Sequence, residues 1–184
     1  MDHYLDIRLQ PEEPEGSESF LLNALFAKLH LRLGQLASGA IGISFPLHSR
    51  RLGPLVRLHG TSSDLASLMA EDWLQGLKGY CDCSDAIAVP ADAGYRTVRR
   101  VQAKSVHNKR QRSIRKGWPS ETEAVERITD NQQRELKLPF VQLKSRSSGQ
   151  VMRIYIEHGP LQTTPVAGTF SAYGLSATAT IPWF

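Results

Sequence analysis

The chain has 184 residues, 41% of them hydrophobic, which is enough to bury one sizeable core or two modest ones and excludes a disordered protein. No apolar run approaches the roughly 20 residues of a membrane-spanning helix, and the amino end lacks the basic and then apolar order of a signal peptide. We therefore expect a cytoplasmic protein. Its formal net charge of +4 is modest for a nucleic-acid binder, so the position of the charges along the chain is more informative than their sum.

The chain opens with a predicted strand and a predicted helix. Residues 4–9 alternate apolar and polar side chains, as a half-buried strand does. Residues 17–33 carry leucines at helical spacing, and Gly34 just beyond them is a stop signal. We therefore expect an amphipathic helix that packs on a sheet and ends at about Leu33.

A second helix and three further strands are expected next. Thr61 and Asp64 have the spacing of a capping box, and apolar residues continue at helical spacing through Leu77. Strands are predicted at 41–45, 55–59 and 87–89. The order strand, helix, strand, strand, helix, strand is that of the ferredoxin-like fold, which many RNA-binding domains share.

The second half starts a new pattern after Gly94. The expected elements are a basic strand at 95–102, a basic helical stretch at about 105–116, a helix at about 120–136, strands at 140–144 and 151–156 joined by a turn at 147–149, a closing segment at 170–175 and an apolar tail at 181–184. We predict an α+β protein with a ferredoxin-like (RRM-like) domain at 1–93 and a smaller α+β domain at 94–184 that carries a basic, RNA-groove-binding helix.

Basic residues are concentrated in one stretch that contains no acid. Between Asp92 and Glu121 the chain has nine basic residues, which are Arg96, Arg99, Arg100, Lys104, Lys109, Arg110, Arg112, Arg115 and Lys116. A block of one sign repels itself unless a polyanion binds to it, and nucleic acid is the usual polyanion. A solvated helix face is the alternative interpretation.

Among the six histidines, His30 lies near the predicted carboxyl end of the first helix, where the helix dipole favours the protonated imidazole. RNA cleavage can use such a group as general acid or base, because the ribose 2′-hydroxyl attacks the adjacent phosphate without a metal. The alternative is a histidine that only covers the helix end. The histidines have no zinc-site spacing, and Cys81 and Cys83 are too few for a structural zinc site, so we expect neither metal nor other cofactor.

Three segments could contact RNA. Arg100 and Gln102 would share a strand face, and these residue types pair with guanine and adenine edges. Arg112, Arg115 and Lys116 share a helix face, with Lys109 beside them, that matches a phosphate-lined groove. The serine-rich turn after Leu143 could position RNA with its hydroxyls, whereas Ser145 lacks the surroundings of a hydrolase nucleophile.

Taken together, these residues resemble the CRISPR RNA-processing endoribonuclease of type I-F systems over essentially the whole chain. The resemblance rests on residues 1–9, 28–30, 100–105, 138–141, 147–150, 158–162, 173–176 and 182–184. It implies metal-independent cleavage of CRISPR precursor RNA at the 3′ base of the repeat hairpin. The products would carry a 5′-hydroxyl and a 2′,3′-cyclic or 3′-phosphate end, and the enzyme would stay on the cut hairpin as a subunit of the interference complex.

The resemblance also implies roles for individual residues. His30 matches the catalytic histidine, Ser145 the serine that positions the 2′-hydroxyl, and Tyr173 a tyrosine that orients the histidine. The implied RNA contacts are Arg100, Gln102, Lys104, Lys109, Arg110, Arg112, Arg115, Lys116, Ser147 and Met152. Met152 departs from the family, because an aromatic ring stacks under the terminal base pair at this position.

Two other interpretations remain open from the sequence. A non-catalytic module could hold the RNA hairpin without cutting it, and it would have no use for a titratable His30 beside the scissile phosphate. A DNA-binding regulator fits the charge but not the absence of a helix-turn-helix pattern.

Overall fold

The computed structural model describes residues 1–10, 17–102, 136–144 and 149–184. The chain divides into two compact units, one formed by Met1–Arg100 with Leu138–Phe184 and the other by Val101–Lys137. Only residues 101, 102, 136 and 137 of the second unit are described. The basic stretch expected at 105–116 and nearly all of the helix expected at 120–136 therefore lie outside the described residues.

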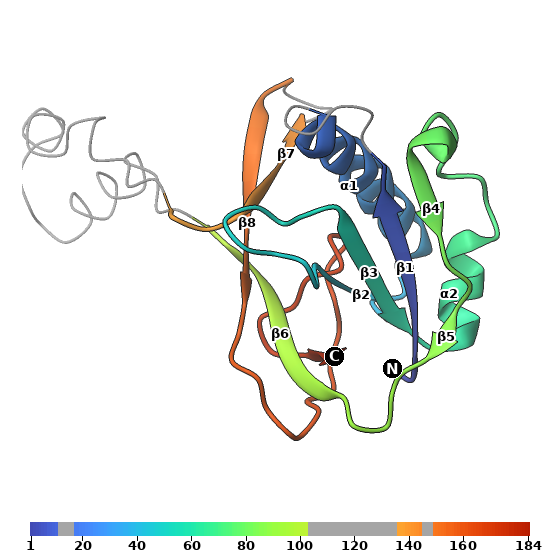
Figure 1. The fold of residues 1–184 in the computed structure, drawn as a ribbon, viewed down its shortest axis with the longest axis vertical. Coiled ribbons are helices and arrows are strands. Elements are labelled where there is room, and N and C mark those ends of the chain that lie inside the picture. The colour runs from blue at the N-terminus through green and yellow to red at the C-terminus, as the bar shows by residue number, and fades with distance from the viewer. Residues whose placement is uncertain (11–16, 103–135, 145–148) are drawn as a thin grey trace, which may run out of the picture. The chain divides into compact units, whose positions relative to one another are not determined.

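A first sheet and two helices come from the amino-terminal part of the chain (Figure 1). The elements are β1 (His3–Leu9), α1 (Ser17–Leu36), β2 (Gly42–Ser44), β3 (Leu55–Gly60), α2 (Ser62–Met69), the 3₁₀ turn η1 (Lys78–Tyr80), β4 (Cys81–Cys83) and β5 (Ile87–Ala88). The sheet order is β2-β3-β1-β4, β5 also pairs with β1, and every pairing is antiparallel. The α+β class that the sequence predicts is confirmed.

The apolar pattern of β1 and α1 forms the core as predicted. Leu5, Ile7 and Leu9 of β1 are buried, and so are the leucines of α1 that recur at helical spacing. The helix, however, continues past Gly34 and ends at Leu36. Gly34 is exposed, and a Cβ there would lie 4.0 Å from the Cβ of Ala172, an ordinary van der Waals distance, so this glycine neither ends the helix nor is required by crowding.

The second helix begins as predicted and ends earlier. Thr61 Oγ1 accepts a hydrogen bond from Asp64 N at 3.1 Å, and the Asp64 carboxylate accepts one from Thr61 N at 3.2 Å, which confirms the capping box. The helix ends at Met69, not at Leu77. Turns that include Gly76, whose φ is +82°, bury Leu77 without a continuous helix, so the helical spacing of the apolar residues misled the prediction.

The last strand of the first sheet is split in two. The sequence predicts one strand at 87–89, whereas β4 pairs with the carboxyl end of β1 and β5 with its amino end. Ile7 lies opposite Cys83, and Tyr4 lies opposite Ile87. The intervening residues 84–86 leave the ladder, and the missed strand β4 has only three residues and no apolar alternation to reveal it.

The second sheet contains the strands from the remainder of the chain. They are β6 (Gly94–Val101), β7 (Phe140–Lys144), β8 (Val151–His158) and β9 (Thr180–Trp183), in the order β7-β8-β6-β9. Lys144 lies opposite Val151, the register of the predicted hairpin. The apolar tail forms β9 and pairs antiparallel with β6. The segment 170–175, by contrast, contains no strand and folds as a turn.

Both sheets contribute to one hydrophobic core. Val98, Ile154 and Ile181 of the second sheet belong to the same buried cluster as Ile43 and Leu25.

The division of the chain into two domains after residue 93, which the sequence predicts, stays a prediction. Within the part of the chain that the structure describes, no helix has the length and apolar character needed to cross a membrane.

Two histidines, the buried His59 and the half-buried His158, make the fold sensitive to acid. Burial and the charge of Arg57 lower the pKa of His59 to about 3, and burial with the neighbouring His48 and Arg96 lowers that of His158 to about 3. His59 Nε2 lies 2.8 Å from the Ser44 hydroxyl. The unfolded chain takes up protons on these rings below about pH 6.5, whereas the folded chain does so only near pH 3.

We therefore expect the free energy of unfolding to fall as the pH drops from about 6.5 towards 3. In the variant Ser44→Ala/His59→Leu one of the two rings is absent, and the fall should be shallower by about 1.4 kcal/mol per pH unit. Urea unfolding at pH 7, 6, 5 and 4 measures this, with the partly exposed His3→Gln as control. An unchanged slope in the double variant would contradict the assignment.

Candidate functional site

His30 lies on α1, six residues before the end of the helix at Leu36. The helix dipole acts mainly on the last turn, so the dipole argument made from the sequence does not distinguish this histidine. The imidazole is half-buried and is held by contacts to a segment near residue 172. These contacts, and not the helix end, determine the orientation and the hydrogen bonding of the His30 ring.

A backbone carbonyl determines the tautomer of His30. The imidazole Nδ1 lies 2.9 Å from the carbonyl oxygen of Ala172, and because a carbonyl can only accept, Nδ1–H is the donor. The neutral ring then carries its lone pair on Nε2. His30 can therefore take a proton at Nε2 and return it, while Nδ1 stays hydrogen-bonded throughout.

Aromatic rings hold the plane of the imidazole. The Tyr173 ring stacks on His30 with a centroid distance of 4.1 Å and an interplanar angle of 9°. The Phe26 ring is nearly parallel to Tyr173, at 6.2 Å and 10°. Phe26 lies four residues before His30, so both project from one face of α1. The sequence predicts a Tyr173 that orients His30, and the structure brings these two rings together.

A tight turn positions Tyr173 against both sheets. Ile43 N of β2 donates to Gly174 O at 2.9 Å, and Ser176 N donates to Val98 O of β6 at 2.9 Å. Gly174 has φ +69°, and a Cβ there would lie 2.8 Å from the Ile43 side chain. Only glycine fits this position without strain, because the backbone is left-handed and the space is occupied.

Arg100 of β6 joins the same cluster. Arg96, Val98 and Arg100 alternate onto one side of β6, where Val98 is fully buried. The Arg100 guanidinium carbon lies 5.4 Å from the centroid of the Tyr173 ring, and its Nε is buried and finds no hydrogen-bond partner among the described residues. The structure thus brings three predicted residues together: His30, Tyr173 and Arg100.

Other predicted residues are either separate from this cluster or not described. Gln102 is exposed and lies one residue beyond the end of β6. Met152 is half-buried on β8, where it packs against the hydrophobic core and lies opposite Leu143. The residues outside the described ranges are Lys104, Lys109, Arg110, Arg112, Arg115, Lys116, Ser145 and Ser147.

Two residues of the cluster were missed by the sequence analysis. Phe26 was assigned only to the apolar face of α1, although its spacing of four from His30 could have indicated contact. Ala172 acts through its backbone carbonyl, which every residue possesses, so no side-chain pattern could reveal it.

Metal-ligating and nucleophilic groups are not gathered elsewhere among the described residues. Across these ranges, no three His, Cys, Asp or Glu side chains lie close enough together to hold a metal ion. Burial raises the pKa of both cysteine thiols, that of Cys83 to about 11, which keeps them protonated at neutral pH.

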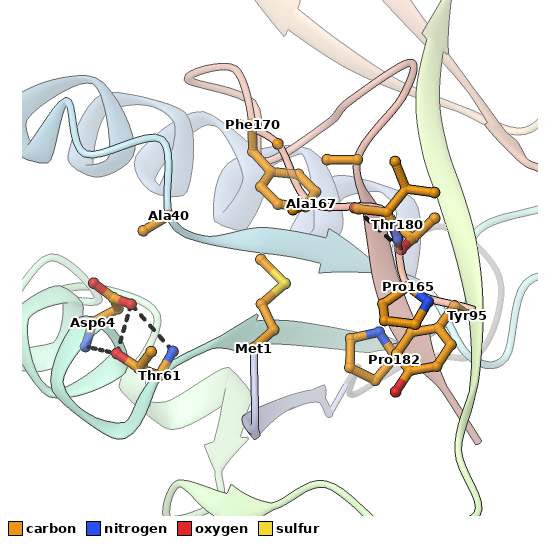
Figure 2. Close-up of a pocket in the computed structure, with 13 residues that line it drawn as sticks. Met1, Ala40, Thr61, Asp64, Tyr95, Pro165, Ala167, Phe170, Thr180 and Pro182 are labelled. Atoms are coloured by element: carbon orange, nitrogen blue, oxygen red, sulfur yellow. Dashed lines mark hydrogen bonds between the residues drawn. The ribbon is translucent and has the colours of Figure 1, made fainter. Parts of the chain in front are cut away.

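A cavity of about 430 Å³ lies apart from the predicted residues (Figure 2). Its lining is mainly apolar and includes Met1, Phe170 and Pro182. The polar pair Thr61 and Asp64 at its edge is engaged in the helix cap, with the Thr61 hydroxyl donating to the Asp64 carboxylate at 2.6 Å. Among the described residues that line this cavity there is no histidine, arginine or lysine, in contrast to the cluster around His30.

Comparison with known proteins identifies a family that matches nearly the whole chain. The family described as CRISPR-associated protein (Cas_Csy4) matches residues 4–184. A protein of Escherichia coli (strain UTI89 / UPEC) named CRISPR-associated endonuclease Cas6/Csy4 is 49% identical over the full length of both chains. A protein of the same name from Pseudomonas aeruginosa (strain UCBPP-PA14) is 47% identical, again over the full length of both.

The left-handed turn at Gly174 yields a test of how Tyr173 is positioned. Gly174→Ala costs about 1 to 2 kcal/mol for the backbone conformation and a further amount for the overlap with Ile43. Gly76→Ala is a matched control, since φ is +82° there but no atom lies within 4 Å of the added Cβ.

We expect Gly174→Ala to lower the thermal midpoint more than Gly76→Ala, and to shift the NMR signals of the His30 ring, which Gly76→Ala should leave in place. At this chain length each kcal/mol corresponds to roughly 2 to 4 °C. Equal midpoints and an undisturbed His30 signal would show that the turn does not position Tyr173.

Proposed function

The chain belongs to the Csy4 family of CRISPR-associated proteins, and from this we propose that it is a metal-independent endoribonuclease that cuts CRISPR precursor RNA at the 3′ base of the repeat hairpin. The family relatives are named endonucleases, and the proposal extends that activity to this chain. The observation that carries it is the hydrogen bond from His30 Nδ1 to the Ala172 carbonyl, which leaves Nε2 able to exchange a proton.

The proposed reaction uses His30 for proton transfer. Nε2 removes the proton of the ribose 2′-hydroxyl, and the 2′-oxygen attacks the adjacent phosphorus. The bond from phosphorus to the 5′-oxygen breaks, and that oxygen leaves as a 5′-hydroxyl after it gains a proton from water. The protonated Nε2 then returns its proton to water. The other product end is a 2′,3′-cyclic phosphate, which water can open to a 3′-phosphate. The stacked Tyr173 ring keeps the imidazole in one orientation during this exchange.

Ser145 is proposed to hold the attacking 2′-hydroxyl in place. It follows Lys144, the last residue of β7, and matches the family serine with this role. The support is the sequence match alone, because Ser145 lies outside the described residues. Proper alignment of a nucleophile contributes several kcal/mol to a rate, so a positioning serine would be catalytically important without itself transferring a proton.

Recognition of the hairpin is assigned to the basic side chains. We propose that Arg100 and Gln102 read base pairs low in the stem and that Met152 covers the terminal pair. The phosphate and groove contacts are proposed for Lys104, Lys109, Arg110, Arg112, Arg115, Lys116 and Ser147. The many phosphates bound would keep the cut hairpin in place and make the enzyme a subunit of the type I-F interference complex.

The first sheet supports the proposed ferredoxin-like assignment of residues 1–93. In that fold two strand–helix–strand halves interleave, so the first strand lies between the third and the fourth. The order β2-β3-β1-β4 with antiparallel neighbours has this arrangement. Residues 94–184 would then form the second domain, with the second sheet and the basic stretch.

The test of the nuclease is cleavage of a labelled repeat hairpin in excess EDTA. The natural protein should cut once at the stem base. His30→Ala should bind the hairpin with similar affinity but cut at least 100-fold more slowly, the lower range for a lost general acid or base. An RNA with a 2′-deoxyribose at the cleavage site is the substrate control and should remain whole. If the natural protein binds without cutting, the non-catalytic hairpin-binding module replaces this proposal.

Base reading by Arg100 is tested with the uncleavable RNA. Arg100→Ala should weaken binding of the matched hairpin by about 1 to 3 kcal/mol and reduce its preference over a hairpin with an altered lower stem pair. Arg99→Ala is the charge-matched control, because Arg99 points to the other side of β6 and pairs with Glu157 at 2.6 Å. Equal losses in both variants, or unchanged discrimination, would contradict base reading.

A further inference from the structure

A second cavity forms a groove along the amino-terminal half of α1. It encloses about 420 Å³ between α1, the segment just before β3 and the start of β7. Its lining includes Asn23, Arg50, Arg51, Phe140 and Gln142. The backbone N–H of Gln142 donates to the Asn23 side-chain oxygen at 2.7 Å, which holds α1 against β7. Of the site residues that the structure describes, His30, Tyr173, Arg100, Gln102 and Met152 do not line the groove.

The chemistry of the groove is basic and aromatic. Arg50 and Arg51 are exposed, and neither forms an ion pair with any residue that the structure describes. The acidic side chain in the lining is Glu18, in the first turn of α1. Phe140 is 37% exposed, and the Arg153 guanidinium lies 4.8 Å from its ring centroid. Basic side chains beside an exposed aromatic ring are typical of surfaces that bind single-stranded nucleic acid.

The groove is aligned with His30 along the same helix. Asn23 and His30 are seven residues apart, which is close to two turns, so both project from one face of α1. Their separation along the helix axis is about 10 Å. A strand that leaves a phosphate held at His30 and follows this face would therefore meet Asn23 and then the arginines after a short distance.

We propose that this groove binds a single-stranded RNA segment that continues from the hairpin beyond the scissile phosphate. The proposal rests on the proposed function, because it needs RNA at His30. The phosphates of the segment contact Arg50 and Arg51, and a base packs on Phe140. The groove would thus extend recognition from the hairpin to its unpaired flank, whose sequence it does not read because stacking and phosphate contacts are tolerant of sequence.

The experiment compares three uncleavable RNAs: the hairpin alone, the hairpin with an unpaired 5′ extension, and the hairpin with an unpaired 3′ extension. Dissociation constants are measured across a salt series for the natural protein and for Arg50→Ala/Arg51→Ala. The control variant Arg8→Ala/Lys78→Ala removes the same charge from exposed positions elsewhere. A third variant, Phe140→Leu, keeps an apolar side chain but removes the ring.

Arg50→Ala/Arg51→Ala should bind the hairpin alone as the natural protein does and bind one extended RNA on the order of tenfold more weakly. Its salt slope for that RNA should fall by about 1.4, which is 0.7 for each lost single-strand phosphate contact. Phe140→Leu should weaken the same RNA. The affected RNA should be the one with the 3′ extension, because the segment beyond the scissile phosphate lies on the 3′ side of the hairpin. An effect on the 5′-extended RNA alone would contradict the proposal.

Three further results would overturn the inference. One is unchanged affinity for both extended RNAs, which would leave the groove to a different occupant, such as a protein subunit. Another is an equal loss for the hairpin alone, which would place the arginines in hairpin binding. The third is an equal loss in the control variant. Failure of the natural protein to bind the hairpin at all would instead refute the proposed function, and the inference with it.

Discussion

The hydrogen bond between the His30 ring and the Ala172 carbonyl is the interaction on which the site depends. It joins α1 to a turn 142 residues further along the chain. That turn is itself held by backbone hydrogen bonds to Ile43 in the first sheet and Val98 in the second. The tautomer of His30 is therefore a property of the folded unit as a whole, because both sheets must form before the carbonyl reaches the ring.

Arginines packed on aromatic rings recur throughout the first unit. The Arg57 guanidinium lies 4.5 Å from the Tyr4 ring and 4.2 Å from the Phe184 ring, and it donates to both oxygens of Asp6 at 2.7 and 2.9 Å. Arg100 lies near Tyr173, with its guanidinium carbon 5.4 Å from the ring centroid, but its Nε has no hydrogen-bond partner in the part of the chain that the structure describes. A guanidinium that packs on an aromatic ring keeps its charge and its planar hydrogen-bond donors. The arginine–ring contacts therefore stabilise the strands, and the guanidinium of Arg100 can still bind another acceptor.

The elements that depend on side-chain periodicity could be predicted from the sequence. The strand at β1, the capping box at Thr61 and the β7–β8 hairpin were confirmed because alternation and cap spacing are local signals. The end of α1 and the extent of α2 were wrong, because distant contacts and turns outweighed local spacing there. His30 and Tyr173 could be named as site residues, but their joint placement depends on a backbone carbonyl, which has no signature in sequence.

Because a backbone carbonyl holds His30, the residue type at position 172 can change as the family diverges. Every residue type supplies a carbonyl, so position 172 is free to change in evolution without loss of the bond to the imidazole. The space around the turn adds little restriction, since a Cβ at Gly34 would lie 4.0 Å from that of Ala172, an ordinary van der Waals distance. We expect residue 172 to tolerate exchange wherever the backbone of the turn keeps its conformation.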